Sequence, residues 1–287
     1  MGSLMAANLA RAGLRVQSFD LNGSGNRGSP REAAAGADIL ITMLPDGEAV
    51  LQAVRAALPG LAAGSIVIDM SSSDPSDTKS LKTLLGKSKI HLLDAPVSGA
   101  KAKAKDGTLA IMVGGDAATL RRARPVLAKL GTEIFHTGGS GSGHATKALN
   151  NYLGAAGTIA GFEALLVGEK FGLDPKVLID VINASTGRNS TTERKIPQQV
   201  FTGAFASGFR MALMTKDVGI ASRMARELGV ETPYLAKTLK VWKDALSRLP
   251  GGADHTEMYR YLKRLKPPSR GAGARRASPR RPRRRST

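Results

Sequence analysis

Two short apolar runs in the first third of the sequence constrain the fold more than any other feature. The run DILITML spans Asp38–Leu44, and the run SIVIDM spans Ser65–Met70. Each is the length of a strand and is apolar at almost every position, which is typical of strands buried on both faces of a parallel sheet. A helical pattern, Glu48–Leu58, separates them. The arrangement predicts an α/β fold.

The rest of the first half continues this alternation of helices and strands. Ser3–Ala12 is rich in helix formers, and Arg15–Phe19 has the composition of a strand. Two further strands are predicted at His91–Leu93 and Leu109–Val113. We therefore expect a Rossmann-type doubly wound sheet, forming a dinucleotide-binding domain over residues 1–144.

The pattern changes in the second half, where helices follow one another without a convincing strand. The first helical stretch, Ala145–Phe171, contains four glycines, which we expect to let another backbone approach closely. Further helical patterns lie at Asp174–Asn183, Asp217–Leu228 and Tyr234–Ala245. An all-α domain that binds substrate and forms subunit contacts is therefore predicted over residues 145–266.

Positive charge is concentrated at the C-terminal end. The chain of 287 residues has a formal net charge of +19, and residues 267–287 carry eight arginines and no acid. The composition of this segment predicts a disordered Arg-rich tail. The remaining excess of positive charge favours encounters with anionic substrates and cofactors, but it does not identify them.

The sequence contains no cysteine, which excludes disulfides, thiolate nucleophiles and cysteine metal sites and fits a reducing compartment. Met1–Ala12 lacks the pattern of a signal peptide. The most apolar helical run, Tyr152–Val167, is too short to span a membrane. We expect a cytoplasmic protein without membrane association.

The N-terminal segment Met1–Asp20 has the form of the second half of a dinucleotide-binding fingerprint. Gly2 would be its third glycine, at the start of a helix whose N-terminal amides face a pyrophosphate. Asp20 ends the predicted second strand, where an acidic side chain can accept hydrogen bonds from the adenosine ribose. Its carboxylate would repel a 2′-phosphate, which favours NAD, while Arg27 in the next loop keeps NADP as the alternative.

The motif GSGHATKALNN, Gly141–Asn151, places a lysine at the start of the long helix. Hydride transfer at a carbon that bears oxygen requires a proton to move on that oxygen. Lys147 can carry this proton if burial, nearby positive charge or the helix N-terminus lowers its pKa. Asn151 follows one helical turn later and can hold the substrate hydroxyl or orient the lysine.

Ser98 and Gly99 lie in the motif DAPVSGAKAKAKDGTLAIMVGG, directly after a predicted strand. A hydroxyl and an unobstructed backbone amide in such a loop can bind a carboxylate. A turn with a purely structural role is the alternative. The four histidines have no metal-ligand spacing, so we expect no metal site.

Together with LMTKD at Leu213–Asp217, these motifs closely resemble the β-hydroxyacid dehydrogenase family, which includes 3-hydroxyisobutyrate dehydrogenase and 2-hydroxy-3-oxopropionate reductase. The resemblance covers nearly all of Met1–Lys266. It implies an oxidoreductase that transfers a hydride between NAD(P) and a small 3-hydroxy acid or its semialdehyde, with Lys147 as general acid/base.

The resemblance also implies roles for single residues. Ser98 and Gly99 would contact the acid group of the substrate. Residues expected to contact the cofactor are Leu44, Pro45, Ser72 and Lys216. An exposed lysine beside Asp217 is the alternative for Lys216. We expect a homodimer or a homotetramer.

The sequence departs from the family pattern at its start. The family's opening strand and Gly-x-Gly turn are missing ahead of Gly2, and Leu21–Pro30 is shorter than in the family. Loss of a central strand would expose inner edges of the sheet. The sequence therefore resembles an N-terminally truncated family member, and if Met1 is the true start, we expect weak cofactor binding and poor stability.

Several alternatives remain open at this point. One is an impaired or non-catalytic remnant of the family, and another is a nucleic-acid-binding role through the tail, which would be sensitive to salt. A 6-phosphogluconate dehydrogenase would carry a histidine in the run that is here Ala148–Leu149–Asn150. An imine reductase would usually lack Lys147.

Overall fold

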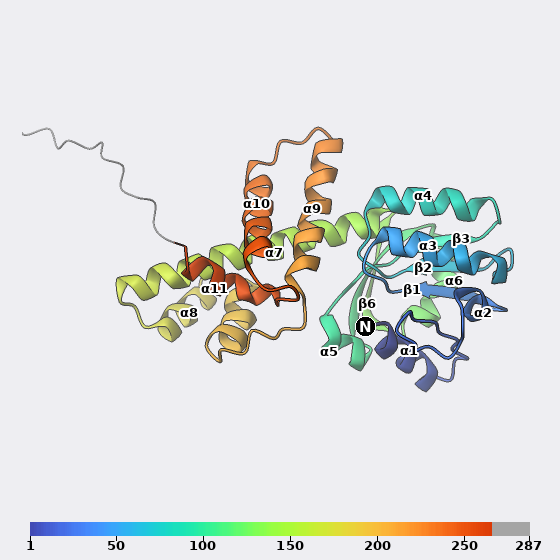
Figure 1. The fold of residues 1–287 in the computed structure, drawn as a ribbon, viewed down its shortest axis with the longest axis horizontal. Coiled ribbons are helices and arrows are strands. Elements are labelled where there is room, and N and C mark those ends of the chain that lie inside the picture. The colour runs from blue at the N-terminus through green and yellow to red at the C-terminus, as the bar shows by residue number, and fades with distance from the viewer. Residues whose placement is uncertain (266–287) are drawn as a thin grey trace, which may run out of the picture.

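A computed structural model describes residues 1–265. Figure 1 shows a sheet flanked by helices at one end of the molecule and an array of helices at the other, joined by the long helix α7 (Ser142–Phe171). The predicted tail, residues 267–287, lies outside the described residues. No helix within residues 1–265 is both long enough and apolar enough to cross a membrane.

The first part of the chain contains a mixed sheet of six strands. The strands are β1 (Ile39–Thr42), β2 (Ile66–Asp69), β3 (His91–Asp94), β4 (Val97–Ser98), β5 (Leu109–Gly115) and β6 (Gly131–Gly138). Strands β1, β2 and β3 are parallel, whereas β5 runs antiparallel to β3 and β4 and parallel to β6. All residues of β2 are buried, as its apolar sequence predicts. The expected Rossmann-type α/β class is confirmed.

The helices on the sheet are α1 (Gly2–Arg11), α2 (Pro30–Ala34), α3 (Gly47–Ala57), α4 (Pro75–Gly86), α5 (Ala100–Asp106) and α6 (Ala117–Leu127), with a short 3₁₀ turn, η1 (Leu58–Gly60). Four of the six helices on the sheet, α2, α3, α4 and α6, begin at side-chain caps. Asp46, Asp74 and Asp116 accept hydrogen bonds from the first-turn amides of α3, α4 and α6, which satisfies groups that have no partner inside the helix. Helix α1 has no such side-chain cap.

The strand predicted at Arg15–Phe19 is wrong, because this segment does not join the sheet. Its backbone groups pair instead with the following turn. The Asn26 side chain accepts a hydrogen bond from the Ser18 amide at 2.8 Å and donates one to the Val16 carbonyl at 3.2 Å. A strand needs a neighbouring strand, and within residues 1–265 β1 pairs only with β2.

The second part is entirely helical, as predicted. After α7 come α8 (Pro175–Asn183), the π-helical segment η2 (Thr191–Val200), α9 (Met211–Glu227), α10 (Pro233–Arg248), η3 (His255–Glu257) and α11 (Met258–Lys263). Its core, which includes the fully buried Phe162 and Trp242, is separate from the two clusters of apolar side chains around the sheet. A domain boundary between residues 144 and 145 stays a prediction.

The glycines of the long helix are only partly explained by close packing. A Cβ at Gly168 would overlap the Leu178 side chain, and one at Gly161 would lie 3.2 Å from the Thr191 side chain. Gly154 faces open space. The atoms nearest Gly161 and Gly168 belong to side chains, so these glycines allow close side-chain packing, and the expected approach of another backbone is not seen at Gly154, Gly161 or Gly168.

Candidate active site

The first turn of α7 is seated on the carboxyl ends of β3 and β5. The backbone amides of Gly141 and His144 donate to the two carboxylate oxygens of Asp94 at 2.7 and 3.1 Å. A Cβ at Gly143 would overlap the carbonyl oxygens of Met112 and Asp94, so only glycine allows this approach. Burial raises the pKa of Asp94, although His144 and the two amides partly oppose this effect. Asp94 thus holds the start of the helix against the sheet.

Lys147 lies one turn further along α7 and is only 9% exposed. Burial lowers its pKa, and the nearby charge of Lys216 lowers it further, whereas Asp217 raises it. Among residues 1–265, no carboxylate lies within 4 Å of its ammonium group. The balance favours the neutral amine more than it does for a lysine in solvent, as a proton carrier requires.

Asn151, one further turn along α7, is held by a residue of α9. Its amide nitrogen donates to Asp217 Oδ2 at 2.6 Å, and both residues are buried. The other carboxylate oxygen, Oδ1, accepts no hydrogen bond, although Lys216 Nζ lies 3.2 Å away. The sequence analysis assigned no role to Asp217, since only the packing of α9 on α7 brings it to Asn151.

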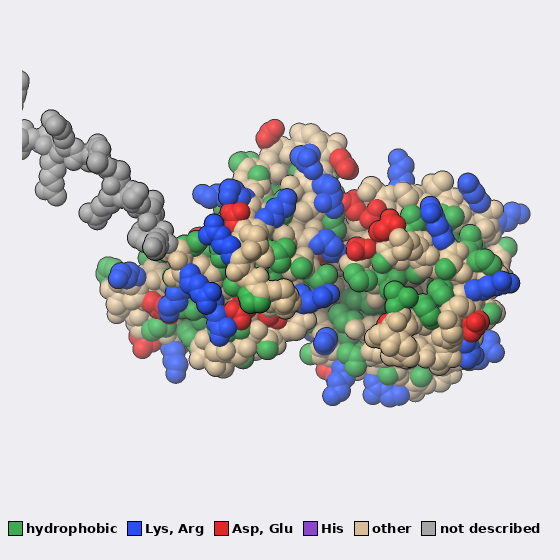
Figure 2. All heavy atoms as spheres, in the orientation of Figure 1, with side chains coloured by type: hydrophobic (Ala, Val, Ile, Leu, Met, Phe, Trp, Pro, Cys, Tyr) green, Lys and Arg blue, Asp and Glu red, His purple; other side chains and the backbone are tan. Residues whose placement is uncertain are grey.

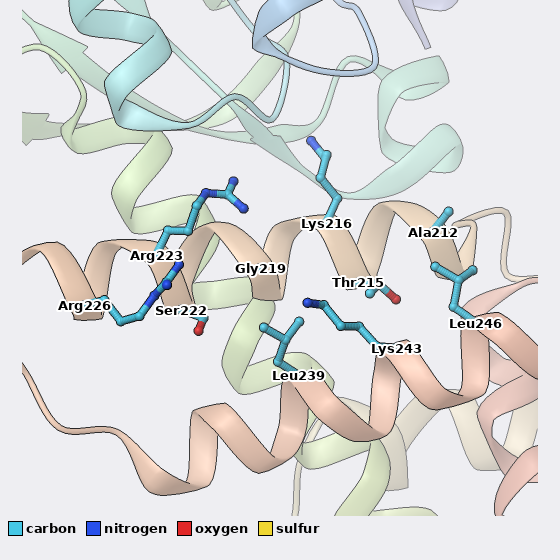
Figure 3. A pocket seen from close by; sticks show the side chains of 10 residues that line it. All are labelled: Ala212, Thr215, Lys216, Gly219, Ser222, Arg223, Arg226, Leu239, Lys243 and Leu246. Atoms are coloured by element: carbon cyan, nitrogen blue, oxygen red, sulfur yellow. The ribbon is translucent and has the colours of Figure 1, made fainter.

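Lys216 and Arg223 reach from α9 toward the loop after β2 (Figure 3). The Lys216 ammonium donates to the Ser72 carbonyl. The Arg223 guanidinium makes two contacts, of 3.0 and 2.9 Å, with Asp74 Oδ2. Figure 2 shows the acidic side chains of the sheet-containing half gathered next to basic side chains of the helical half. The structure therefore joins the predicted cofactor residues Ser72 and Lys216, and adds Arg223, which the sequence analysis missed.

The predicted cofactor residues Leu44 and Pro45 lie in the loop after β1. The Leu44 amide donates to Ser71 Oγ at 2.9 Å, and the Ser71 amide donates to Asp69 Oδ1 at 3.0 Å. Leu44 is half-buried and Pro45 is exposed. The fully paired Asp69 thus connects the loops that follow β1 and β2, at the edge of the sheet where parallel α/β proteins bind ligands.

Of the two remaining predicted cofactor residues, Gly2 lies near the site and Asp20 does not contact it. Gly2 opens α1, and a Cβ on it would lie 3.6 Å from the Met43 side chain, next to the carboxyl end of β1. Asp20 is exposed in a turn, where its carboxylate accepts a hydrogen bond from the Asn22 amide at 3.0 Å. The structure therefore puts Gly2 beside the loop of Leu44 but joins Asp20 to none of the other predicted site residues.

Ser98 ends β4, and Gly99 is the residue before α5. Figure 1 shows α5 on the side of the sheet-containing half that is turned toward the helices. Both residues are partly exposed. Gly99 has φ of 134°, and the next residue, Ala100, has φ of 55° although it is not glycine. Two successive residues with positive φ turn the backbone sharply, and such strain is common at ligand-binding loops.

A cavity of about 380 Å³ lies between α9 and α10 (Figure 3). Its lining includes Lys216 and Arg223 but not Lys147, Asn151 or Ser98. The cavity therefore adjoins the predicted site from the outer side of α9. The hydrogen-bonded cluster around Lys147 gives the better location for the chemistry.

Comparison with known proteins agrees with this geometry. Residues 1–138 match a family model described as the NAD-binding domain of 6-phosphogluconate dehydrogenase. Residues 141–262 match one described as the NAD-binding part of NADP-dependent 3-hydroxyisobutyrate dehydrogenase. The fold and the site thus define a nicotinamide-dependent oxidoreductase.

Individual relatives are similar over most of their length. The chain is 35% identical to 2-(hydroxymethyl)glutarate dehydrogenase of Eubacterium barkeri, over 85% of each protein. It is 36% identical to 3-hydroxyisobutyrate dehydrogenase of Pseudomonas aeruginosa, over 83% of this chain and 87% of that protein.

A solved structure is similar as well. The structure of Mycobacterium tuberculosis 3-hydroxyisobutyrate dehydrogenase with L-serine has a TM-score of 0.85 and 34% identity, covering 92% of this chain and 96% of that one. The chain belongs to the β-hydroxyacid dehydrogenase family, whose members use NAD(P) to oxidise or reduce small hydroxy acids and semialdehydes. This membership does not favour the nucleic-acid-binding or non-catalytic alternatives.

Proposed function

We propose that Lys147 is the general acid/base of an NAD(P)-dependent 3-hydroxyacid dehydrogenase. The observation that carries the proposal is a buried lysine without a carboxylate partner, whose pKa is lowered by burial and by Lys216. Asn151 lies one turn away on the same helix and is fixed by Asp217. A proton carrier and a hydrogen-bond donor are thus held side by side on rigid elements.

The chain's own residues account for the proton transfer. In the oxidation direction, the neutral amine of Lys147 takes the proton of the substrate hydroxyl. One amide hydrogen of Asn151 is used by Asp217, and the other can donate to the substrate oxygen. In the reduction direction, the ammonium of Lys147 returns the proton to that oxygen. The cofactor, when bound, accepts or supplies the hydride.

The residues of the sheet edge fit a nicotinamide dinucleotide. Helix α1 has no side-chain cap, so its first amides suit a pyrophosphate, with Gly2 as the closest approach. We propose that Leu44, Pro45, Ser72 and Lys216 hold the nicotinamide end. The fit is good at the loops after β1 and β2, where the Asp69 network holds the backbone in place.

We infer a preference for NAD from Asp20, because its carboxylate repels a 2′-phosphate. Replacement by serine removes the charge, and we expect the ratio of the two kcat/KM values, NAD over NADP, to fall by about tenfold, or roughly 1.4 kcal/mol. Asp106 to serine, a change of an acid in α5, is the matched control. An unchanged ratio in Asp20→Ser would remove Asp20 from the cofactor site.

We propose a substrate that carries both a carboxylate and a primary alcohol or the corresponding aldehyde. The names of relatives include 2-(hydroxymethyl)glutarate, 3-hydroxyisobutyrate and L-serine dehydrogenases, and these substrates share that pair of groups. Ser98 and Gly99 would bind the carboxylate through the hydroxyl and the backbone amide. Ser98→Ala should then raise the substrate KM by roughly tenfold, the cost of about one hydrogen bond to a charged group.

A panel of small 3-hydroxy acids with NAD and NADP, followed at the nicotinamide absorbance, tests the proposed function. We expect turnover of at least one member and its loss in Lys147→Met. If no member is oxidised, and no semialdehyde is reduced, the non-catalytic alternative replaces the proposal. Removal of residues 267–287 should leave turnover unchanged, whereas a nucleic-acid-binding role would require them.

We propose a homodimer or homotetramer formed through the helical half. Apolar side chains at four-residue spacing are exposed at the ends of α7 and α8, namely Val167, Phe171, Val177 and Val181. Exposed apolar groups of this kind commonly mark subunit contacts. Phe171→Asp should lower the molar mass measured by light scattering, while the control Leu228→Asp, at an exposed residue after α9, should not.

We also propose a cytoplasmic location. Support comes from the absence of cysteine, since the chain needs no oxidising compartment for its stability. Cell fractionation tests this directly, and recovery of the protein in a secreted or organelle fraction would contradict it.

A further inference from the structure

His144 lies deeper than any other polar side chain of the first turns of α7. Its side chain is 0% exposed, and Lys147 follows three residues later, on the same side of the helix. The sequence analysis expected no metal site at this histidine and assigned it no other role. Its position is unusual because the ring stands between the two buried carboxylates of the sheet edge, Asp69 and Asp94.

The ring has a close neighbour at each nitrogen. His144 Nδ1 is within hydrogen-bond distance of Thr78 Oγ1, at 2.7 Å, and that hydroxyl also lies 3.4 Å from the Asp74 carbonyl. His144 Nε2 is 3.5 Å from Asp69 Oδ2 and has no hydrogen-bond partner of its own. Because a carboxylate can only accept, a hydrogen on Nε2 suits this side of the ring.

Two buried carboxylates face the ring. Asp69 and Asp94 are 2% and 0% exposed. His144 is the one side chain within residues 1–265 that can be cationic and lies within 4 Å of both. Beyond them lie Asp74, the N-cap residue of α4, and Asp77 in the first turn of that helix. Buried carboxylates are costly unless they are paired, and the His144 ring is the group placed to pair with them.

The same contacts link the cofactor loops to the catalytic helix. Asp69 accepts hydrogen bonds from Thr42, Ser71 and Ser73, and so holds the loops that carry Leu44 and Ser72. The His144 ring lies against this carboxylate, while its backbone amide is bound by Asp94. A displacement of the ring would therefore move the first turn of α7 relative to both loops.

We propose that His144 is a positioning residue, which clamps the first turn of α7, and with it Lys147, to the cofactor-binding edge of the sheet. The proposal rests on the proposed function of Lys147 and adds the group that sets its place. His144 touches neither substrate nor cofactor in this role. Its effect on the reaction passes through the position and the burial of the Lys147 amine.

The test compares His144→Leu with His144→Gln in the full-length chain. A misplaced catalytic group commonly costs about 10- to 100-fold in rate, so we expect kcat of His144→Leu to fall by that factor. Glutamine can donate to Asp69 and share a hydrogen bond with Thr78. It should restore kcat to within about threefold of the wild type, whereas a glutamine variant as slow as the leucine variant would overturn the proposal.

A second readout does not depend on turnover. The reactivity of Lys147 toward acetic anhydride, followed by mass spectrometry against pH, reports the pKa of this amine directly. In His144→Leu we expect that pKa to rise toward the value of a solvent-exposed lysine, because the amine loses its burial. An unchanged titration would overturn the proposal, and this result is informative even if the wild type oxidises no member of the panel.

His255→Leu is the matched control. His255 is also buried, 5% exposed, and its Nδ1 lies 3.4 Å from Asp254, but it sits at the start of η3. We expect His255→Leu to lower Tm without moving the Lys147 titration. If His144→Leu does not fold, Thr78→Val removes one ring partner and should show the same changes at smaller size, with an unaltered titration again opposing the proposal.

Discussion

The sheet-containing half and the helical half present their candidate functional residues in different ways. Lys147, Asn151 and Asp217 project from the interiors of two long helices that pack on each other. The predicted cofactor residues Leu44 and Ser72 lie in loops after strands, held by side-chain hydrogen bonds. The reacting groups are thus positioned by a packed core, whereas the cofactor groups depend on a local polar network.

Substitutions in the two halves should therefore have different effects. In the helical half, one buried apolar cluster fixes α7 against α9. Lys147, Asn151 and Asp217 should therefore keep their positions unless a substitution disrupts this cluster. In the sheet-containing half, Arg15–Phe19 is held by a turn instead of a neighbouring strand. We expect proton-transfer defects from the first region and cofactor-affinity defects from the second.

The largest effect is expected from Lys147→Met. General acid/base groups contribute about 10²- to 10⁴-fold, and kcat should fall by that factor while the Kd for NADH stays within about threefold. Lys195→Met is the control, since this lysine, whose pKa burial lowers to about 8, donates to Thr158 Oγ1 at 2.7 Å and belongs to no proposed step. Equal activity of the two variants would contradict the role of Lys147 as the general acid/base.

Phe162→Ala should have the next largest effect, on stability. The side chain is fully buried against Tyr259, and its loss should lower the free energy of unfolding by about 3–5 kcal/mol. Phe171→Ala, on the same helix but 82% exposed, should change the monomer's stability by less than about 0.5 kcal/mol. Urea unfolding followed by the fluorescence of Trp242, the single tryptophan, measures both.

Two charge changes around Lys147 should move the pH profile in opposite directions. Oxidation needs the neutral amine, so kcat/KM falls as pH drops through the Lys147 pKa. Asp217 raises that pKa, so Asp217→Asn should move the acid limb of the kcat/KM profile to lower pH. Lys216 lowers the same pKa, so Lys216→Met should move the acid limb to higher pH. Shifts of the same sign would show that another group controls the profile.

The smallest effect is expected at the substrate loop, where Ala100 has φ of 55°. Glycine adopts this conformation without strain, so Ala100→Gly should stabilise the protein by about 1 kcal/mol, or about 2–4 °C in Tm. Ala104→Gly, in the same helix with its methyl group buried, should destabilise it by a similar amount. A lower Tm in Ala100→Gly would contradict strain at this loop.

Much of the fold was predictable because it depends on local patterns. The apolar runs predicted β1 and β2 to within about two residues, and four helical patterns predicted α7 to α10. The prediction of a strand at Arg15–Phe19 was wrong, because residues with a high strand propensity form a strand only when a neighbouring strand offers hydrogen bonds. Only the first residue of β6 is buried, and its sequence GTEIFHTG has no apolar run to recognise.

Motifs and periodicity are local properties of the chain, so they were enough to predict the family, the α/β and all-α halves and the candidate lysine. The groups that surround this lysine became known from the packing of the helices on one another and on the sheet. Asp217 meets Asn151 across 66 positions, and His144 meets Asp69 across the junction of α7 and the sheet. Such pairs carry no sequence signal, since the distance between two side chains in space is set by packing and not by their separation along the chain.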